Sequence, residues 1–276
     1  MENELKRIKT KILSDKLPIW EDYSPFQEHM PDERLDNNYF SVAYDKALEA
    51  LETLDSNKYS IHMIGEIMQD RFTGLSPQKD GDTPLIEKTN VMSNVILPIF
   101  EKFATVENGK EKFIIEKDDL LLSKDGSPGV ASAISEGLLN ILRDEFGIEK
   151  VAIATHVYKI QLKEEYKKYA PFIGAFMNSK LGQALVRRFI SGSVSPTIRR
   201  DDVDKIIIVI PKENNLVNET RLKLAELQRQ AIAYSRYVQY SNELVAKMFD
   251  KTPEIPKLPI NWMPGGKRDP HGYDKE

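Results

Sequence analysis

The clearest pattern of hydrophobic and polar positions lies between residues 214 and 249. Small and apolar residues recur there three and four positions apart, through more than four heptads, at Val217, Thr220, Leu224, Leu227, Ala231, Tyr234, Val238, Ser241, Val245 and Met248. This spacing predicts a long helix with a coiled-coil seam. At about 1.5 Å per residue the helix is roughly 54 Å long, so we expect part of it to meet another helix or subunit. The residues expected to make this dimer or partner contact are Leu224, Leu227, Ala231, Tyr234, Val238 and Val245. The alternative is a helix that lies flat on its own domain.

Before this helix the pattern changes to short apolar runs separated by Gly, Pro, Asn and Asp, which is typical of mixed α and β structure. Enrichment in β-branched residues and flanking turn residues predict strands at 84–86, 113–115, 120–122, 151–154, 157–162 and 205–210. An amphipathic helix is predicted at 36–54, and one or two helices at 171–189, opened by Pro171 and interrupted near Gly182.

Four segments follow from these patterns. We expect an N-terminal arm and lead-in helix at 1–57, an α/β domain at 58–212, the long helix at 213–250 and a Pro-rich flexible tail at 251–276. The start at Met1 and the irregular arm favour an independent chain.

Composition excludes several classes of protein. The chain has 276 residues, 41% of them hydrophobic and 30% charged, which is ordinary for a globular protein. Without a long apolar run or a signal-peptide core, neither membrane insertion nor secretion is indicated, and we expect a cytoplasmic protein. The absence of cysteine excludes disulfides, thiolate nucleophiles and Cys-based zinc sites.

Familiar catalytic motifs are also absent from the sequence. The four histidines, His29, His62, His156 and His271, show no ligand spacing, so we predict no metal site and interpret each as a surface or core residue. There is no P-loop, no G-x-G-x-x-G turn, no G-x-S-x-G elbow and no Asn/Asp-Pro-Pro-aromatic loop. We therefore predict no catalytic residue and no bound cofactor.

The distribution of charge is more informative than its total. Lys and Arg number 39 against 43 Asp and Glu, for a net charge of −4. Residues 166–200, however, hold seven basic residues and no acidic one. This basic island indicates either a nucleic-acid contact or a solvated helix face.

Two polar loops stand out around this island. Residues 123–129 (SKDGSPG) follow a predicted strand, and residues 190–200 (ISGSVSPTIRR) carry four hydroxyls and end in two arginines. Backbone amides, hydroxyls and Arg suit phosphate oxygens, although tight turns also account for the glycines.

Short motifs follow one another in a particular order. SIHMIGEI stands at 60–67, TPLIEKTNV at 83–91 and DDLLLSKDG at 118–126, with Gly74 between the first two. Then come APF at 170–172, LG at 181–182, SGS at 191–193, Ile198, DV at 202–203 and IIVIP at 207–211. RLDNNYF at 34–40 precedes them all. Each motif is weak alone, and the order is the specific part.

In this order the motifs resemble the target recognition domain of type I restriction-modification specificity subunits and of related fused methyltransferases. The family patterns they match are "L-x-E-I", "P-x-I-x-x-x-N-I", "G-D-I-L-I-S-x-x-G", "P-x-Y-L…L-x-S-x-x-G" and "G-S…I-x-x-x-x-L…I-x-I-P", with Asp118 standing where the family often has Gly. The long helix is similar to the family's spacer helix. The resemblance covers residues 34–249.

The resemblance implies an α+β fold in which a mixed α/β target recognition domain, 58–212, precedes a long coiled-coil-type spacer helix. It implies a non-catalytic chain, with S-adenosylmethionine bound by a partner methyltransferase. The expected partners are double-stranded DNA, adenine methyltransferase (M) subunits and a second copy of the chain. A restriction (R) subunit is an optional further partner, and no membrane contact is expected. The usual specificity subunit has two recognition domains and two helices, whereas this chain has one of each. We therefore expect a half-subunit that dimerises to read a bipartite site.

The candidate DNA-binding residues come from the two loops and one strand end. They are Lys88, Asn90, Lys124, Ser127, Ser193, Ser195, Thr197, Arg199 and Arg200. Lys88 and Asn90 are the candidates for base edges, because Lys can pair with guanine and Asn with adenine. For Arg187 and Arg188 we favour a solvated surface over phosphate binding.

Two other functions fit the same sequence. One is the recognition module of a fused type II methyltransferase-nuclease. The other is an interaction protein of a defence complex that has lost DNA binding, which a lack of salt-dependent DNA affinity would reveal.

Overall fold

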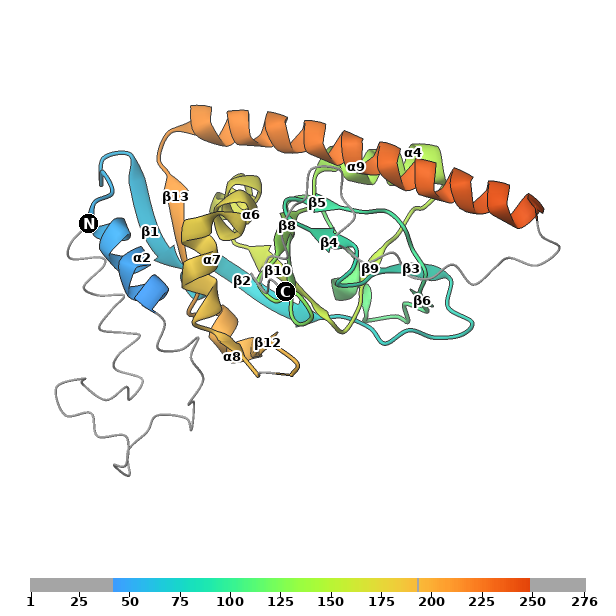
Figure 1. Cartoon of the computed structure of the whole chain (residues 1–276), viewed down its shortest axis with the longest axis horizontal. Coiled ribbons are helices and arrows are strands. Elements are labelled where there is room, and N and C mark those ends of the chain that lie inside the picture. The colour runs from blue at the N-terminus through green and yellow to red at the C-terminus, as the bar shows by residue number, and fades with distance from the viewer. Residues whose placement is uncertain (1–41, 193, 249–276) are drawn as a thin grey trace, which may run out of the picture. The chain divides into compact units, whose positions relative to one another are not determined.

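The computed structural model describes residues 42–192 and 194–248 (Figure 1). The predicted arm up to residue 41, the RLDNNYF motif and the Pro-rich tail at 251–276 lie outside these residues. The described chain combines helices with sheets, which confirms the predicted α+β class. It divides into two compact units, one ending at Ser235 and the other beginning at Arg236.

The central sheet has four antiparallel strands in the order β2-β10-β7-β8. Their bounds are Met68–Thr73 for β2, Val157–Leu162 for β10, Leu120–Ser123 for β7 and Ala131–Ala133 for β8. In this register Tyr158 lies opposite Thr73 on one side and Leu122 on the other. The predicted strands at 120–122 and 157–162 are confirmed.

Smaller sheets surround the central one. Strand β1 (Tyr59–Met63) pairs antiparallel with β13 (Ile207–Pro211), so the two ends of the segment 59–211 lie side by side. In a second small sheet, β3 (Thr83–Ile86) lies between β6 (Phe103–Ala104) and the parallel β9 (Ala152–Ile153). Two short hairpins complete the strands. They are β4–β5 (Val91–Met92, Val95–Ile96) and β11–β12 (Ile190–Ser191, Thr197–Ile198).

The helices cover these sheets. They are α2 (Val42–Glu52), α3 (Ile64–Ile67), η3 (Glu111–Phe113), α4 (Glu136–Phe146), α5 (Glu164–Lys167), α6 (Ala170–Asn178), α7 (Lys180–Arg187), α8 (Arg200–Val203) and α9 (Asn214–Met248). The interruption predicted near Gly182 falls at Ser179, whose side chain accepts a hydrogen bond from the Gly182 amide and caps α7.

One predicted strand, 113–115, is reduced to a single antiparallel bridge between Ile114 and Ala152. Residues 111–113 form the 3-10 helix η3, because the amides of Phe113 and Ile114 donate to the nearby carbonyls of Lys110 and Glu111. The Phe113 ring packs edge-on against Phe72 instead of alternating along a strand. Local hydrogen bonds therefore outweigh the β propensity of this segment.

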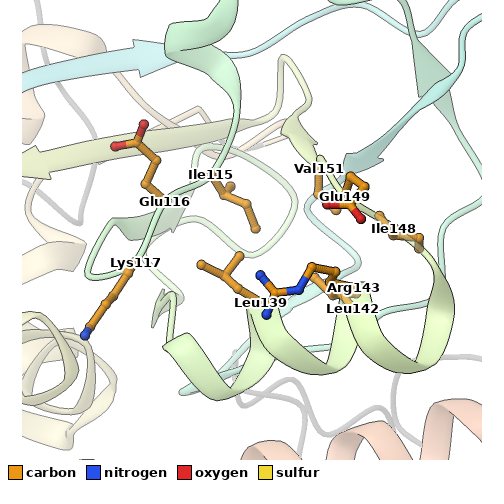
Figure 2. A pocket seen from close by; sticks show the side chains of 9 residues that line it. All are labelled: Ile115, Glu116, Lys117, Leu139, Leu142, Arg143, Ile148, Glu149 and Val151. Carbon is orange, nitrogen blue, oxygen red and sulfur yellow. The ribbon is translucent and has the colours of Figure 1, made fainter.

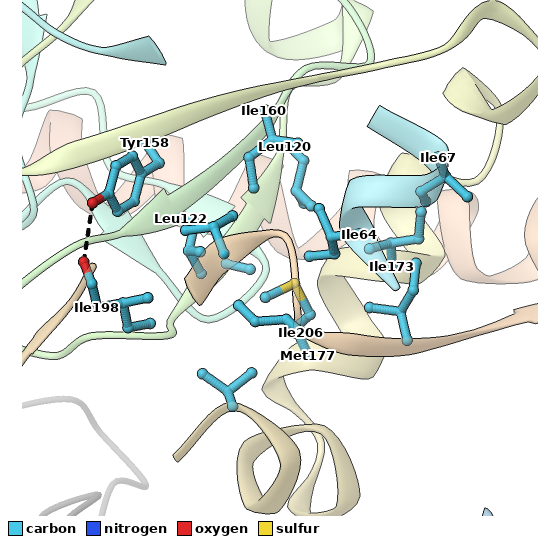
Figure 3. Close-up of a cluster of buried hydrophobic side chains, with 14 of the residues drawn as sticks. Ile64, Ile67, Leu120, Leu122, Tyr158, Ile160, Ile173, Met177, Ile198 and Ile206 are labelled. Carbon is cyan, nitrogen blue, oxygen red and sulfur yellow. Dashed lines mark hydrogen bonds between the residues drawn. The ribbon is translucent and has the colours of Figure 1, made fainter. Parts of the chain in front are cut away.

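The core lies on both faces of the central sheet. Leu120, Leu122 and Ile160 face one buried cluster with Ile173 and Met177 of α6 (Figure 3). Their neighbours Leu121 and Val157 face a second cluster that includes α4. Because successive side chains of a strand point to opposite faces, a strand buried on both faces has a continuous apolar run such as Leu120–Leu122.

Two positions of the resemblance motifs have a steric explanation. A Cβ atom on Gly182 would lie 2.0 Å from the carbonyl oxygen of Phe176, so glycine allows α7 to begin directly against α6. Asp118, where the family often has Gly, has a φ of +65°, in the left-handed region that favours glycine.

The first part of α9 lies on the segment 59–211. The Gln228 side chain accepts from the Ile96 amide at 2.9 Å and donates to the Ile96 carbonyl at 2.7 Å. Arg221 lies 3.4 Å from the Asp118 carboxylate, and Val217 and Ile232 are buried. Residues 217–235 therefore match the alternative interpretation, a helix that lies flat on its own domain.

The predicted seam flanks this buried face. Leu227 is 44% exposed, and Leu224, Ala231, Tyr234 and Val238 are partly exposed, whereas the Val245 side chain lies outside the described residues. Dimerisation through this seam stays a prediction.

Candidate nucleic-acid interface

Three connections that are far apart in sequence meet at one end of the central sheet. The Ile198 amide and the Thr197 hydroxyl both donate to the Lys124 carbonyl, at 2.9 and 3.1 Å. The Lys124 amide in turn donates to the His156 carbonyl at 3.0 Å. These bonds join the β7–β8 loop, the β11–β12 hairpin and the β9–β10 turn into one surface, which we call the loop end.

The β11–β12 hairpin supplies the most exposed part of the loop end. Gly192 has a φ of +93°, and a Cβ there would lie 2.7 Å from the Ser195 carbonyl oxygen, so the turn requires glycine. Ser195 is exposed and Val194 is 94% exposed, whereas Thr197 uses its hydroxyl within the protein. Ser193 lies outside the described residues.

The β7–β8 loop presents one lysine and one carboxylate. The Lys124 side chain is partly exposed and has no ion pair within 42–192 and 194–248. Ser127 closes the turn, because its amide donates to the Asp125 carbonyl at 3.0 Å. Lys124 is therefore the free cation of this loop within the described residues.

Asp125 connects two basic side chains. Its Oδ1 lies 2.9 Å from Lys88 Nζ and its Oδ2 lies 2.6 Å from His156 Nδ1. Partial burial alone would raise the pKa of Asp125, but the hydrogen bonds from His156 and Lys88 outweigh burial and hold this pKa below its ordinary value. An ionised Asp125 thus holds Lys88 and His156 together.

The two arginines that follow the hairpin are both exposed. Arg200 donates to the Arg71 carbonyl at 3.3 Å, and the Arg71 guanidinium is paired with Asp204 and with Asp201, the latter at 3.4 Å. Arg199 has no side-chain hydrogen bond to any described residue. Asp201 of α8 and Asp204, directly after it, therefore bind Arg71 and leave Arg199 available.

Asn90 must be withdrawn as a base-edge candidate. It is 5% exposed, its Oδ1 accepts from the Glu87 amide, and its Nδ2 donates to the carbonyls of Leu97 and Ile99. An amide that is buried and fully hydrogen-bonded has no group left for DNA. In the sequence, Asn90 is a short polar residue after a strand. Such a residue can close a turn or contact DNA, and the sequence pattern does not distinguish the two roles.

Much of the basic island has a structural role. The Arg188 guanidinium lies over the Tyr44 ring at 4.5 Å, Lys168 lies over Tyr169 at 4.8 Å, and Lys167 pairs with Glu164 at 2.6 Å. The first contact joins the segment to a distant helix, and the other two join residues that are close in sequence. The island therefore does not form a single cationic surface.

His156 is the functional candidate that sequence reasoning missed. It was interpreted as a surface or core residue because no second histidine lies at ligand spacing. Its position beside Asp125 depends on a contact across 31 residues of sequence. The one local signal was its place in the turn between two predicted strands.

A cavity of about 270 Å³ lies beside α4. It is lined by Ile115, Glu116, Lys117, Leu139, Leu142, Arg143, Ile148, Glu149 and Val151 (Figure 2). Its lining contains neither a histidine nor a hydroxyl. Within the described residues, no group of three or more His, Asp or Glu side chains could hold a metal ion, and no helix is long and apolar enough to cross a membrane.

No protein-family model and no curated protein matches the chain. Among solved structures, the type I restriction-modification S subunit from M. genitalium is 15% identical, with a TM-score of 0.38 over 60% of this chain and 38% of that one. The HsdS subunit from Thermoanaerobacter tengcongensis is 12% identical, with a TM-score of 0.40 over 74% and 46%.

A third solved structure comes from a study of complex assembly and conformational transition of the type I R-M system. It is 11% identical, with a TM-score of 0.40 over 89% of this chain and 53% of that one. The chain thus spans 38% to 53% of the length of these three proteins. The first and third of these structures are described as parts of type I restriction-modification systems.

Proposed function

We propose that this chain is a non-catalytic DNA recognition subunit of a restriction-modification complex. It reads DNA through the loop end, and methylation belongs to adenine methyltransferase subunits that bind S-adenosylmethionine. A second copy of the chain supplies the other half of a bipartite site. A restriction subunit joins the complex where cleavage accompanies modification.

The observation that carries this proposal is the convergence of the two polar loops. They are separated by about 70 residues in the sequence, yet the Ile198 amide and the Lys124 carbonyl hydrogen-bond at 2.9 Å. The convergence brings Lys124, Ser195 and Arg199 to one end of a rigid sheet. Ammonium, hydroxyl and guanidinium groups are the side-chain donors that most often bind phosphate oxygens.

The expected dimer is supported by the surface of α9. Leu227 is half exposed and lies beside the partly exposed Leu224, Ala231 and Tyr234. A stripe of this kind can bury its apolar atoms against a second helix.

DNA binding is tested by the salt dependence of affinity. Each phosphate contact contributes about −0.9 to the slope of log affinity against log salt. We expect the variant K124Q/R199Q/R200Q to reduce the magnitude of this slope by about 2 to 3, measured by fluorescence anisotropy with fragments of genomic DNA. The matched control is K117Q/K150Q/K223Q, which removes the same charge at exposed positions outside the loop end.

Equal slopes for the loop-end variant, the control variant and the unmodified chain would refute the loop end as the DNA contact. A chain without salt-dependent binding at all would support the interaction-protein alternative.

Assembly is tested separately, by light scattering of the chain alone and with a co-expressed adenine methyltransferase from the same locus. We expect a dimer that binds the methyltransferase. A chain that stays monomeric with both methyltransferase and DNA would contradict the half-subunit.

A further inference from the structure

The group that the proposed function leaves unexplained is the cluster of Lys88, Asp125 and His156. It lies at the loop end, because the His156 carbonyl accepts from the Lys124 amide at 3.0 Å. A carboxylate repels DNA phosphates, so the position of Asp125 beside the candidate DNA contacts requires an explanation.

Both oxygens of Asp125 are in use. Oδ1 accepts from Lys88 Nζ at 2.9 Å, and Oδ2 is 2.6 Å from His156 Nδ1. Since an ionised carboxylate is only an acceptor, Nδ1 of His156 must carry the proton of that hydrogen bond. The second nitrogen, Nε2, is therefore the one that gains and loses a proton.

The His156 ring is held in place and reaches solvent. Its side chain is 48% exposed, and Nε2 has no hydrogen bond to any residue within the described part of the chain. When Nε2 is neutral it offers a lone pair, which repels a phosphate oxygen. When Nε2 is protonated it donates, and the cluster of one carboxylate, one ammonium and one imidazolium has a net charge of +1.

We propose that His156 is a proton-dependent contact to the DNA backbone and that Asp125 is its positioning residue. This inference rests on the proposed function. Asp125 fixes which ring nitrogen faces outward, and Lys88 prevents the carboxylate from repelling DNA.

The charged neighbours of this cluster come from several elements. Asp125 and Lys88 contact it directly, and Lys124 follows from the same loop. Further out, Arg71, Arg200 and Asp201 interact electrostatically with the Tyr158 phenol, as Asp125 does. Apart from His156, the groups in this set are not histidines, and none ordinarily titrates between pH 6 and pH 8.

The affinity for DNA should therefore fall as the pH rises. Between pH 6 and pH 8 at constant ionic strength, we expect a loss on the order of tenfold, the effect of one charge-assisted hydrogen bond. The measurement is fluorescence anisotropy of the full chain with fragments of genomic DNA.

Variants assign this effect to the cluster. H156Q should bind at pH 6 about as weakly as the unmodified chain binds at pH 8, with little dependence on pH. H156K should bind tightly at both pH values. D125N should reduce the pH dependence, because the His156 ring then loses the carboxylate that orients it. H62Q changes a histidine on β1 and should keep the full dependence.

A second readout is the titration of the His156 ring by NMR, with and without DNA. DNA should raise the pH at which this ring titrates.

The outcomes separate the two proposals. Salt-dependent binding whose pH profile is the same in H156Q as in the unmodified chain overturns the role of His156 and leaves the proposed function intact. An absence of salt-dependent binding at every pH overturns the proposed function itself.

Discussion

The ion pair between Lys159 and Asp119 lies inside the domain. Lys159 stands on β10 with its side chain fully buried, 3.1 Å from Asp119 Oδ2, and Asp119 is 4% exposed. Lys159 also donates to the Ile114 carbonyl, and the Glu116 amide donates to Asp119 at 2.6 Å. By alternation along β10, Lys159 points to the same face as Val157, toward the cluster that includes α4.

Replacing Lys159 by methionine keeps the length of the side chain but leaves Asp119 without its cation. Removing one partner of a buried ion pair costs about 3–5 kcal/mol of unfolding free energy. We expect K159M to lose that amount at pH 8. The double variant D119N/K159M should lose less than the sum of the single variants, because it removes both charges and keeps an acceptor for the Glu116 amide.

The pH dependence has a definite sign. Burial raises the pKa of Asp119 from 3.8 to about 6, although Lys159 and the Glu116 amide favour the ionised form. The folded state therefore binds this proton more tightly than the unfolded state. The resulting stabilisation is complete below pH 3.8 and is lost as the pH rises through about 6. For this shift of about two pH units, it amounts to at most about 3 kcal/mol.

Without Lys159 the pKa of Asp119 should rise further, so K159M should be more costly at pH 8 than at pH 5. Urea unfolding followed by circular dichroism at the two pH values measures this difference. The control K223M removes an exposed lysine of α9, which pairs with Glu219, and should change little. A loss from K159M that is under about 1 kcal/mol, or equal at both pH values, would refute the reasoning.

Two further predictions concern packing. G182A should lower the free energy of unfolding by about 1–3 kcal/mol or more, because its Cβ would lie 2.0 Å from the Phe176 carbonyl oxygen. The control G137A, whose Cβ has its nearest contact at 3.9 Å, should raise the free energy of unfolding by up to about 1 kcal/mol through helix propensity. Thermal unfolding should shift in opposite directions, and equal shifts would contradict the steric argument. Q228L should speed amide hydrogen exchange in the first half of α9, because it leaves the buried Ile96 amide and carbonyl unpaired, while the exposed control Q230L should not. Unchanged exchange in Q228L would show that Gln228 does not hold the helix.

Local patterns in the sequence predicted the long helix α9 and several strands, but not β2, β8 or α4. The continuous apolar run Leu120–Leu122 and the spacing along 217–238 are visible in the sequence, since the periods of strands and helices are properties of the chain itself. At Asp118, where the family often has glycine, the backbone adopts the left-handed conformation that glycine favours. Local hydrogen bonding overruled propensity at residues 111–113, which form a 3-10 helix.

The candidate site was predictable only in part. Both polar loops could be identified by their glycines and hydroxyls, and the structure brings Lys124 beside Thr197. The roles of Asn90 and His156 could not be identified, because a side chain's burial and partners depend on residues distant in sequence. Sequence alone determined the long helix and the strands with continuous apolar runs, such as β7 and β10. Only the tertiary structure decided which loops meet and which of their side chains remain free, because those depend on long-range pairing of strands.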